Sequence, residues 1–548
     1  MFVVGSPRFL ENDLADLAKR RGAGVAWIAA FERHDTMAPM HVHGDFAVAV
    51  RDHNERVFLA VDRFSICTLC YRVAGDAIEA HPRADVVAGT GAEQDPQAIF
   101  DYLYFHAIPA PRTIFKGVYR LPAGHCAKFE RGRLTVTRWW NPVFVEDRPA
   151  PFGALRDEFR ALLTDCVRRQ INGDTAACFL SGGTDSSTVA GIAAEVTGRA
   201  PQTFSIGFDA KGYDEMEYAR IAARHFKTDH HEYYVTPDDL VASIPLVAAS
   251  YDQPFGNSSV VPAYYCAKVA REFGGTRILG GDGGDELFGG NTRYAMQRLF
   301  GFYGQLPRMF RSGLVEPVLG DTRRVARLPL IRKAASYVEQ ARVPMPERTQ
   351  MYNLLTRLGV AQVLTPDFLA SVDMESPMRQ QREVYAACTA GSLINQMLAF
   401  DWRYTLAEND IPKVVGATSL AGISVGFPLL DDLLVDFSLR IEPRLKLKGL
   451  QLRWFFKEAL RGFLPDEIIK KKKHGFGLPF GVWVNQHATL KALASDSIHS
   501  LGTRGIVRED FLGKLMTEYL PQHPGYYGEM IWILMMLEQW MQSTVDRR

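Results

Sequence analysis

The 548-residue chain is predicted to fold as a mostly β domain followed by an α/β domain with a parallel sheet and a helical C-terminal extension. Three patterns support this. Short alternating strands fill the first part of the chain, strands and helices then alternate as far as Leu279, and helical spacing dominates the rest. At roughly 150 residues per domain, the length allows two to four domains.

In the first domain, residues 44–51 and 56–61 alternate as strands do, and residues 96–106 form one helical stretch. The charged, proline-bearing segment 146–151 is the predicted linker. We therefore expect the first domain to span residues 1–147.

The second domain is expected to span residues 152–541, beginning with helical spacing over residues 152–170. Strands and helices that alternate in this way indicate βαβ units and a parallel sheet. The predicted strands are 175–180, 203–208, 231–235 and 277–279, the helices between them are 215–226 and 263–273, and a final buried helix covers 529–541.

Charge and composition exclude several kinds of partner. The 62 acidic residues balance 63 Lys plus Arg, which argues against a chain built to neutralise nucleic acid or an anionic membrane. The apolar block 530–537 is much shorter than the roughly 20 residues of a membrane-spanning helix. Seven scattered cysteines and an N-terminus unlike a secretory signal favour a cytoplasmic protein, with no nucleic-acid or membrane partner expected.

The most specific motif is Phe179-Leu-Ser-Gly-Gly-Thr-Asp-Ser-Ser187, between a predicted strand and a helix. Its two glycines let the backbone approach an anion, and the helix N-terminus offers unpaired N–H groups. The Gly-Lys-Ser/Thr of the common P-loop is absent, and Asp185 could hold a magnesium ion instead. The motif predicts a phosphate-binding loop, the alternative being a Ser/Gly-rich turn without a ligand.

A second motif, Gly280-Gly-Asp-Gly-Gly-Asp-Glu-Leu-Phe-Gly-Gly290, follows another predicted strand. In a parallel sheet it would open at the same edge as the first motif, where such folds bind ligands. Asp282 and Asp285 could complete a magnesium site with Asp185, or one of them could act as a base. A calcium loop is the competing interpretation, but the helix-loop-helix spacing with a terminal Glu is missing.

These motifs, SGGTDSS and GGDGGDELFGG, resemble the synthetase domain of asparagine synthetases and their relatives. Further similar segments occur in family order at 203–208, 213–215, 229–232, 252–255, 427–431 and 473–479. Segments 44–50, 62–66, 108–114 and 121–125 resemble the glutamine-hydrolysing domain of the same family. The resemblance therefore covers nearly the whole chain.

The resemblance implies an amidotransferase-like β-sandwich domain of the N-terminal-nucleophile (Ntn) type, then an ATP-pyrophosphatase-type α/β domain. It also implies an ATP-dependent ligase that converts a carboxylate to an acyl-adenylate, releases pyrophosphate, and lets an amine displace AMP. The implied cofactors are ATP and Mg²⁺.

Individual residues receive roles from the same resemblance. Lys473 and Asp282 are the catalytic candidates, and Asp185 and Asp285 would bind Mg²⁺. Lys473 would approach the phosphates or the oxyanion of the second step, although residues 470–473 could also be a solvated basic run. The residues expected to bind ATP are Leu180, Ser181, Gly182, Gly183, Asp185, Ser186, Ser205, Gly207 and Gly281.

The chain departs from the family where glutamine is hydrolysed. That chemistry needs a cysteine after the initiator Met, with its own α-amine as base. Position 2 is Phe, the first cysteine is Cys67, and Cys67-Thr-Leu-Cys-Tyr71 replaces the family's Lys-Pro-Leu-Tyr. We expect this domain to keep its fold without releasing ammonia from glutamine.

Two departures concern the synthetase domain. Ile423-Ser-Val-Gly426 stands where relatives have Leu-Glu-Val-Arg, which indicates either a lost structural ion pair or a reshaped acceptor pocket. Asp282 replaces the family's usual Glu and is shorter by one methylene, so it could change how an amine is held.

Three acceptor amines fit these residues: free ammonia, an amine within the same substrate, or an external amine. Family members without the cysteine include β-lactam-forming synthetases and lasso-peptide cyclases, so macrolactam closure of a lasso-type precursor peptide is the favoured prediction. The expected partners are then the carboxylate substrate, a precursor peptide and its processing protease. Asparagine synthesis and an inactive scaffold are the alternatives, and the sequence makes no prediction of oligomeric state.

Overall fold

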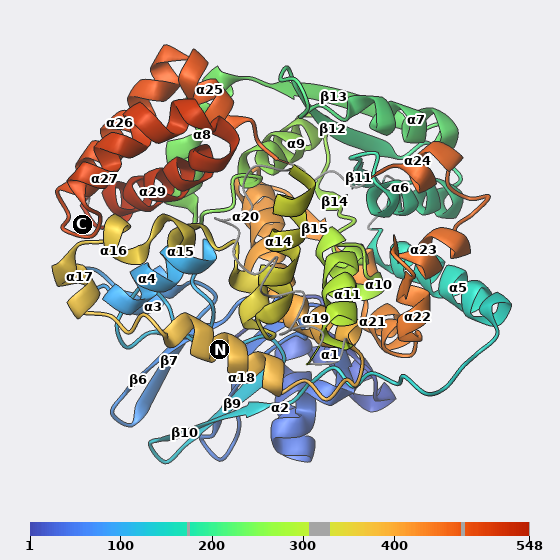
Figure 1. Ribbon diagram of the computed structural model, residues 1–548. Coiled ribbons are helices and arrows are strands. Elements are labelled where there is room, and N and C mark those ends of the chain that lie inside the picture. Colours follow the sequence, from blue (N-terminus) through green and yellow to red (C-terminus); the bar gives the residue numbers. More distant parts are fainter. Residues whose placement is uncertain (172–175, 306–308, 310–328, 473–476, 547–548) are drawn as a thin grey trace.

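The computed structural model describes residues 1–171, 176–305, 309, 329–472 and 477–546 (Figure 1). Within these residues, no helix combines the length and the apolar character that crossing a membrane requires.

The N-terminal domain contains a five-stranded antiparallel sheet and a three-stranded sheet. The larger sheet has the order β1 (Phe2–Gly5), β4 (Phe46–Arg51), β5 (Val57–Val61), β9 (His125–Glu130) and β10 (Arg133–Arg138). The smaller has the order β7 (Ala77–His81), β6 (Cys70–Ala74) and β8 (Tyr119–Arg120). The predicted strands 44–51 and 56–61 are confirmed as β4 and β5.

Alternation along β4 and β5 places apolar side chains on both faces of the larger sheet. Ala49 and Leu59 share a buried cluster with Tyr71 of the smaller sheet. Phe46 and Phe58 point the other way and pack with Trp27. Each face therefore has its own core.

Two helices cover that second face: α1 (Asn12–Arg21) and α2 (Ala23–His34). The sequence pattern predicts a single helical stretch in this domain, which is wrong on this point. The expected helix 96–106 is confirmed as α4 (Pro96–Phe105), but α1 has one fully buried residue, Leu14, and ten positions that are mostly polar. The apolar residues Leu14, Leu17 and Ala18 nevertheless recur at helical spacing and pack toward the sheet, so the signal for α1 is present in the sequence.

The second domain is built on a parallel sheet with the order β13-β12-β11-β14-β15. Its strands are β11 (Ala177–Phe179), β12 (Gln202–Phe208), β13 (Asp229–Val235), β14 (Arg277–Leu279) and β15 (Ser424–Gly426). The first four confirm the predicted strands, although residue 175 lies outside the described part. β15 was not expected, since three residues carry no readable alternation and the exposed edge of β14 supplies the pairing.

Helices cover both faces of this sheet. On one face α5 (Phe152–Gln170), α6 (Thr184–Thr197) and α7 (Met216–Phe226) share a core with β11. On the other, α9 (Val260–Glu272) packs on Phe204 and Ile278, with α8 (Pro237–Ser250) and α20 (Ile411–Leu420) beside it. Helices on both faces leave the carboxyl edge of the strands open for a ligand.

Shorter helices surround that edge and connect it to the C-terminal part of the chain. They are α10 (Gly284–Phe288), α11 (Thr292–Gln305), α14 (Pro329–Arg342), α15 (Leu354–Leu358), α16 (Val360–Val363), α17 (Pro366–Ala370), α18 (Ser376–Ala386), α19 (Leu393–Asp401), α21 (Asp432–Leu439), α22 (Pro443–Lys446), α23 (Trp454–Ala459) and α24 (Asp466–Lys470).

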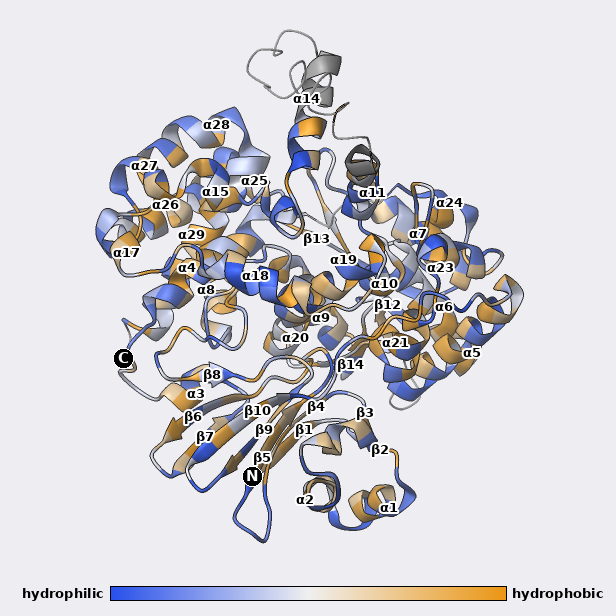
Figure 2. Ribbon diagram, turned by 60° about the horizontal axis from the view of Figure 1, so that its bottom comes forward, coloured by the Kyte–Doolittle hydropathy of each residue, from blue (hydrophilic) through white to orange (hydrophobic). Residues whose placement is uncertain are grey.

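The C-terminal helices pack around α29 (Pro524–Thr544), whose residues 530–537 are almost completely buried. They include α25 (Phe480–Gln486), α26 (Ala488–Gly502) and α27 (Glu509–Lys514), and Figure 2 shows α29 lying among α26, α8 and α4. Tyr102 of α4 donates a hydrogen bond of 2.8 Å to the carbonyl of Ile533. The N-terminal domain and the C-terminal helices thus share one continuous core.

The predicted linker is fastened to the second domain. The Glu146 carboxylate accepts hydrogen bonds from the N–H of Gly391 at 2.9 Å and the side-chain amide of Asn395 at 2.7 Å. The Asn395 carbonyl oxygen in turn accepts from the Lys446 ammonium at 2.9 Å. Lys446 is fully buried, and burial lowers its pKa to about 7.

We expect Lys446→Met to flatten the pH dependence of thermal stability above neutral pH. In the unfolded chain Lys446 keeps its proton up to the ordinary lysine pKa of about 10.4. In the folded protein it releases the proton at a pKa of about 7. The unfolded state therefore binds more protons between these values, so this group makes stability rise with pH. Melting temperatures at several pH values would measure the slope, with Lys448→Met as the exposed control. Equal slopes in wild type and Lys446→Met would contradict the prediction.

Candidate active site

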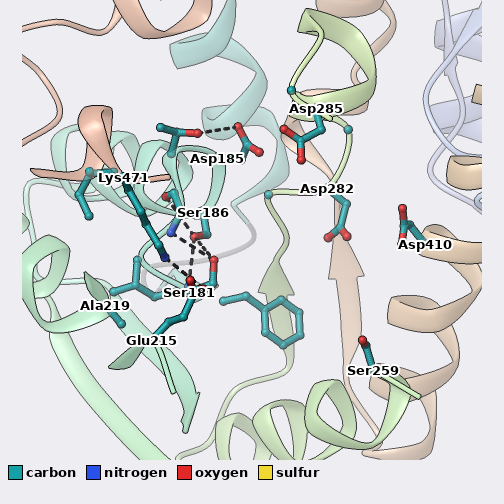
Figure 3. A pocket seen from close by; sticks show the side chains of 18 of the residues that line it. Ser181, Asp185, Ser186, Glu215, Ala219, Ser259, Asp282, Asp285, Asp410 and Lys471 are labelled. Atoms are coloured by element: carbon teal, nitrogen blue, oxygen red, sulfur yellow. Dashed lines mark hydrogen bonds and ion pairs between the residues drawn. The ribbon is translucent and has the colours of Figure 1, made fainter. Parts of the chain in front are cut away.

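A cavity of about 970 Å³ opens at the carboxyl edge of the parallel sheet (Figure 3). The two glycine-rich motifs, which follow β11 and β14, both line it. Its walls also include residues of α9, of α20 and of the segment after β17 (Gln451–Leu452). The volume lies at the upper end of the range for small-molecule sites, roughly 300–1,000 Å³.

The first motif forms the loop between β11 and α6, as predicted. The Ser186 hydroxyl lies 3.1 Å from the Ser181 N–H and 3.0 Å from the Ser181 hydroxyl, which closes the loop around its own backbone. Gly182 has a left-handed φ of 64°, and a Cβ there would lie 2.3 Å from the Tyr218 carbonyl carbon. The first residues of α6 line the cavity. The N–H groups of a first helical turn have no partner within the helix, so an anion there would be stabilised.

Most of the predicted ATP-binding residues line this cavity. These are Leu180, Ser181, Gly183, Asp185, Ser186, Ser205 and Gly281. The Gly182 carbonyl accepts a hydrogen bond from the Lys471 ammonium. Gly207 lies beside Tyr234, and a Cβ on Gly207 would lie 2.6 Å from the Tyr234 ring.

The second motif approaches the first so closely that a Cβ at either of two of its glycines would overlap the first loop. A Cβ on Gly281 would lie 2.6 Å from the backbone nitrogen of Ser186. A Cβ on Gly284 would lie 2.4 Å from a carboxylate oxygen of Asp185. The glycines thus bring Asp185 next to Asp285, although 100 residues separate them in the chain.

Gly284→Ala should displace the Asp185 carboxylate and weaken Mg–ATP binding by about tenfold, because small misplacements in such sites are costly. Nucleotide-induced stabilisation in a thermal melt would report the loss. Gly301→Ala is the matched control, since a Cβ there meets nothing within 4 Å. If Gly284→Ala responds to nucleotide as wild type does, the close contact between Gly284 and Asp185 does not affect Mg–ATP binding.

Arg453 lies between the two predicted magnesium ligands. Its Nη1 is 2.6 Å from both carboxylate oxygens of Asp185 and 2.9 Å from Oδ1 of Asp285. The two carboxylates therefore already hold a cation, and their oxygens are the donors that Mg²⁺ prefers, so the pair fits the metal. No motif marks Arg453 in the sequence, because it follows a short two-stranded hairpin far from either loop.

Lys471, in the basic run, contacts the predicted phosphate-binding loop. Its Nζ lies 3.3 Å from the Gly182 carbonyl and 3.2 Å from a Glu215 carboxylate oxygen, and Figure 3 shows Lys471 close to Ser181. Burial lowers the pKa of Lys471, and Glu215 partly offsets this. Lys473, the predicted catalytic lysine, lies outside the described residues.

A second group of charges lies at the other end of the cavity, where Figure 3 shows Asp282 facing Asp410. Lys413 Nζ is 3.2 Å from Asp410 and 3.7 Å from Asp282. Burial raises the pKa of Asp282, while Lys413 lowers it in part, and burial together with Asp410 raises the pKa of Glu286 to about 8. The pKa of Asp282 is therefore shifted in the direction that favours taking up a proton, compared with an exposed aspartate.

Neither Ser424 nor Gly426 lines this cavity. A Cβ on Gly426 would lie 2.6 Å from the side-chain oxygen of Gln170 and 2.9 Å from Arg277 Nη2, and these two side chains are hydrogen-bonded to each other. The Ser424 hydroxyl donates to the Thr276 carbonyl at 3.2 Å. Of the two interpretations of this departure, a changed structural contact is favoured over a reshaped pocket.

Comparison with known proteins places these features in a family. Residues 158–542 match the asparagine synthase family model, and residues 26–140 match a glutamine amidotransferase domain. The chain belongs to the asparagine synthase family. It is therefore an ATP-dependent, amide-forming ligase, with an amidotransferase-like domain followed by a synthetase domain.

Several relatives within the family are similar over different lengths. Asparagine synthetase [glutamine-hydrolyzing] 1 of Bacillus subtilis is 23% identical over 95% of this chain and 81% of its own. A putative asparagine synthetase of Methanocaldococcus jannaschii is 37% identical over 42% of this chain and 46% of its own. A carboxyethyl-arginine β-lactam synthase of Streptomyces clavuligerus is 33% identical over 48% and 49%.

Proposed function

We propose that this ligase activates a carboxylate with ATP and joins it to an amine that the chain does not release from glutamine. The reaction we favour is macrolactam closure of a lasso-type precursor peptide. The observation that carries the proposal is Phe2, which stands at the head of β1 where a glutamine-hydrolysing relative needs its cysteine nucleophile.

Phe2 has no group that could attack glutamine, and no other side chain in its surroundings offers an activated thiol. Its ring lies 6.5 Å from that of His81 and packs, partly buried, against the core between the two sheets. Cys67 approaches β1 at Gly5, but burial and the carboxylates of Asp62 and Asp45 raise the pKa of its thiol well above the ordinary value. The thiolate is the nucleophile, so Cys67 is a poor substitute.

Burial also raises the pKa of the other six thiols. The arginine of the Asp-Arg-Phe motif, Arg63, forms ion pairs with the second domain, with Asp432 at 2.8 Å and with Asp436 at 2.5 Å. We infer that the N-terminal domain, residues 1–147, is an Ntn-type sandwich kept as structural support for the ligase, residues 152–541.

The described site suggests how the chain would perform the reaction. The N–H groups and hydroxyls around Ser181 and Ser186 would hold the phosphates that leave as pyrophosphate, with Lys471 beside them. The resemblance assigns Lys473, outside the described residues, to the same task. Asp185 and Asp285 would hold Mg²⁺, which when bound neutralises charge on the leaving group.

At the far end of the cavity, Asp282 would take the proton of the attacking amine, since its raised pKa suits that task. Asp282, Asp410 and Glu286 outnumber Lys413, the cation that pairs with the first two of them. This surplus of carboxylates would attract a positively charged amine substrate before the amine loses its proton. The similarity to a β-lactam synthase supports an amine within the same substrate.

Two alternatives are carried with the proposal. Similarity to relatives named asparagine synthetases supports an aspartate substrate with ammonia as acceptor. A catalytically inactive scaffold is the other, and the intact phosphate loop with its lysine argues against it.

The test supplies ATP and Mg²⁺ with three substrate sets: aspartate and glutamine, aspartate and ammonium, and peptides that carry a free amine and a side-chain carboxylate. AMP release and a product lighter than the peptide by one water are expected with the third. Asparagine made from glutamine would refute the proposal, and asparagine made only from ammonium would favour the first alternative. No AMP with any set and no ATP-induced rise in melting temperature would favour the scaffold.

A further inference from the structure

The contact between Arg453 and the two loop carboxylates is built into the backbone. Arg453 has a left-handed φ of 52°, and its N–H donates to the Gly289 carbonyl at 3.1 Å. A Cβ on Gly290 would lie 2.6 Å from Arg453 Nε. The end of the second motif thus forms a glycine cradle for this guanidinium, whose side chain is only 10% exposed.

The guanidinium uses the oxygens that a metal would need. Its Nη1 contacts both oxygens of Asp185 and Oδ1 of Asp285 at 2.6–2.9 Å. Mg²⁺ binds carboxylate oxygens at about 2.0–2.1 Å and demands near-octahedral geometry. A divalent cation and a guanidinium in contact with the same oxygens would repel each other strongly, so the two cannot share the site.

We propose that Arg453 is an internal counter-cation that occupies the magnesium site until Mg–ATP displaces it. This inference rests on the assignment of Asp185 and Asp285 as metal ligands in the proposed function. The released guanidinium stays in the cavity, where the ATP phosphates give it new acceptors.

Such a competition makes metal and nucleotide binding interdependent. Without nucleotide, the metal must displace Arg453 into water, and its apparent affinity falls by the fraction of molecules in which the site is free. With nucleotide, the phosphates bind both the metal and the guanidinium, so ATP favours the metal-bound state. The ligase then assembles its metal site only with its substrate present.

The test measures Mn²⁺ binding to the full chain without nucleotide, from the electron paramagnetic resonance signal of free Mn²⁺. Arg453→Gln should bind Mn²⁺ about tenfold more tightly than wild type. Lys457→Gln is the matched control, because Lys457 lines the same cavity and acts on Asp185 only through space. It should tighten binding by less than about threefold, as expected for a screened charge.

Unchanged or weaker Mn²⁺ binding in Arg453→Gln would overturn the inference, and so would an equal gain in Lys457→Gln. Arg453→Lys keeps the charge without the planar donor group and should give an intermediate affinity, and it decides the question if Arg453→Gln does not fold. Asp285→Asn added to Arg453→Gln should remove the gained affinity. If Asp285→Asn leaves Mn²⁺ binding intact, the metal assignment itself fails, and the inference with it.

Discussion

Asp285→Asn should lower the rate of adenylate formation by about 10³-fold, because it removes one of the two carboxylates that we propose hold Mg²⁺ at the leaving pyrophosphate. The substitution keeps the size of the side chain and loses only its charge. Exchange of labelled pyrophosphate into ATP, with whichever carboxylate supports it in wild type, measures the step before any amine is involved.

Asp157→Asn is the control for this substitution, since Asp157 is an exposed residue of α5 that pairs with its exposed neighbour Arg156 at 2.8 Å. Its exchange rate should match that of wild type. Exchange within a few-fold of wild type in Asp285→Asn would remove Asp285 from the mechanism. Circular dichroism would show whether either variant is misfolded.

Lys471→Ala should slow the same exchange reaction by about 10²-fold, the usual loss when one donor to a developing negative charge is removed. Lys471 is 9% exposed and contacts the phosphate loop at the Gly182 carbonyl. Its ammonium is thus positioned before ATP binds, which spares the cost of ordering a long side chain.

Lys470→Ala provides a control with the same change of charge in the same basic run. Lys470 is 70% exposed and pairs with Asp466 at 2.7 Å, so its removal should change exchange by less than about threefold. Equal losses in both variants would mean that the run acts through its net charge alone. No loss in Lys471→Ala would leave the phosphate role to Lys473.

The elements of the second domain were predicted well because each depends on neighbours in the sequence. Buried strands such as β12 and helices such as α5 follow local apolar spacing, and the loop after β11 is defined by adjacent glycines and hydroxyls. The short edge strand β15 was missed because its partner β14 stabilises it. The helices α1 and α2 were missed although their apolar residues recur at helical spacing in the sequence itself.

The same distinction applies to the site. Gly281 and Gly284 are visible as glycines in the sequence, but their purpose appears only where each meets the first loop. Lys413 and Arg453 belong to no motif, and they reach the cavity from segments more than 100 residues away from the second loop.

By itself the sequence determined the family resemblance, the two loops that would hold ATP, and the absence of a cysteine at position 2. Those features lie within short stretches of chain, where residue type and spacing are enough to predict the chemistry. Only the tertiary structure decided which charges stand against the loops: Arg453 on the carboxylates, Lys471 on the phosphate loop and Lys413 beside Asp282. Such contacts depend on how distant segments pack, and packing is a property of the whole fold.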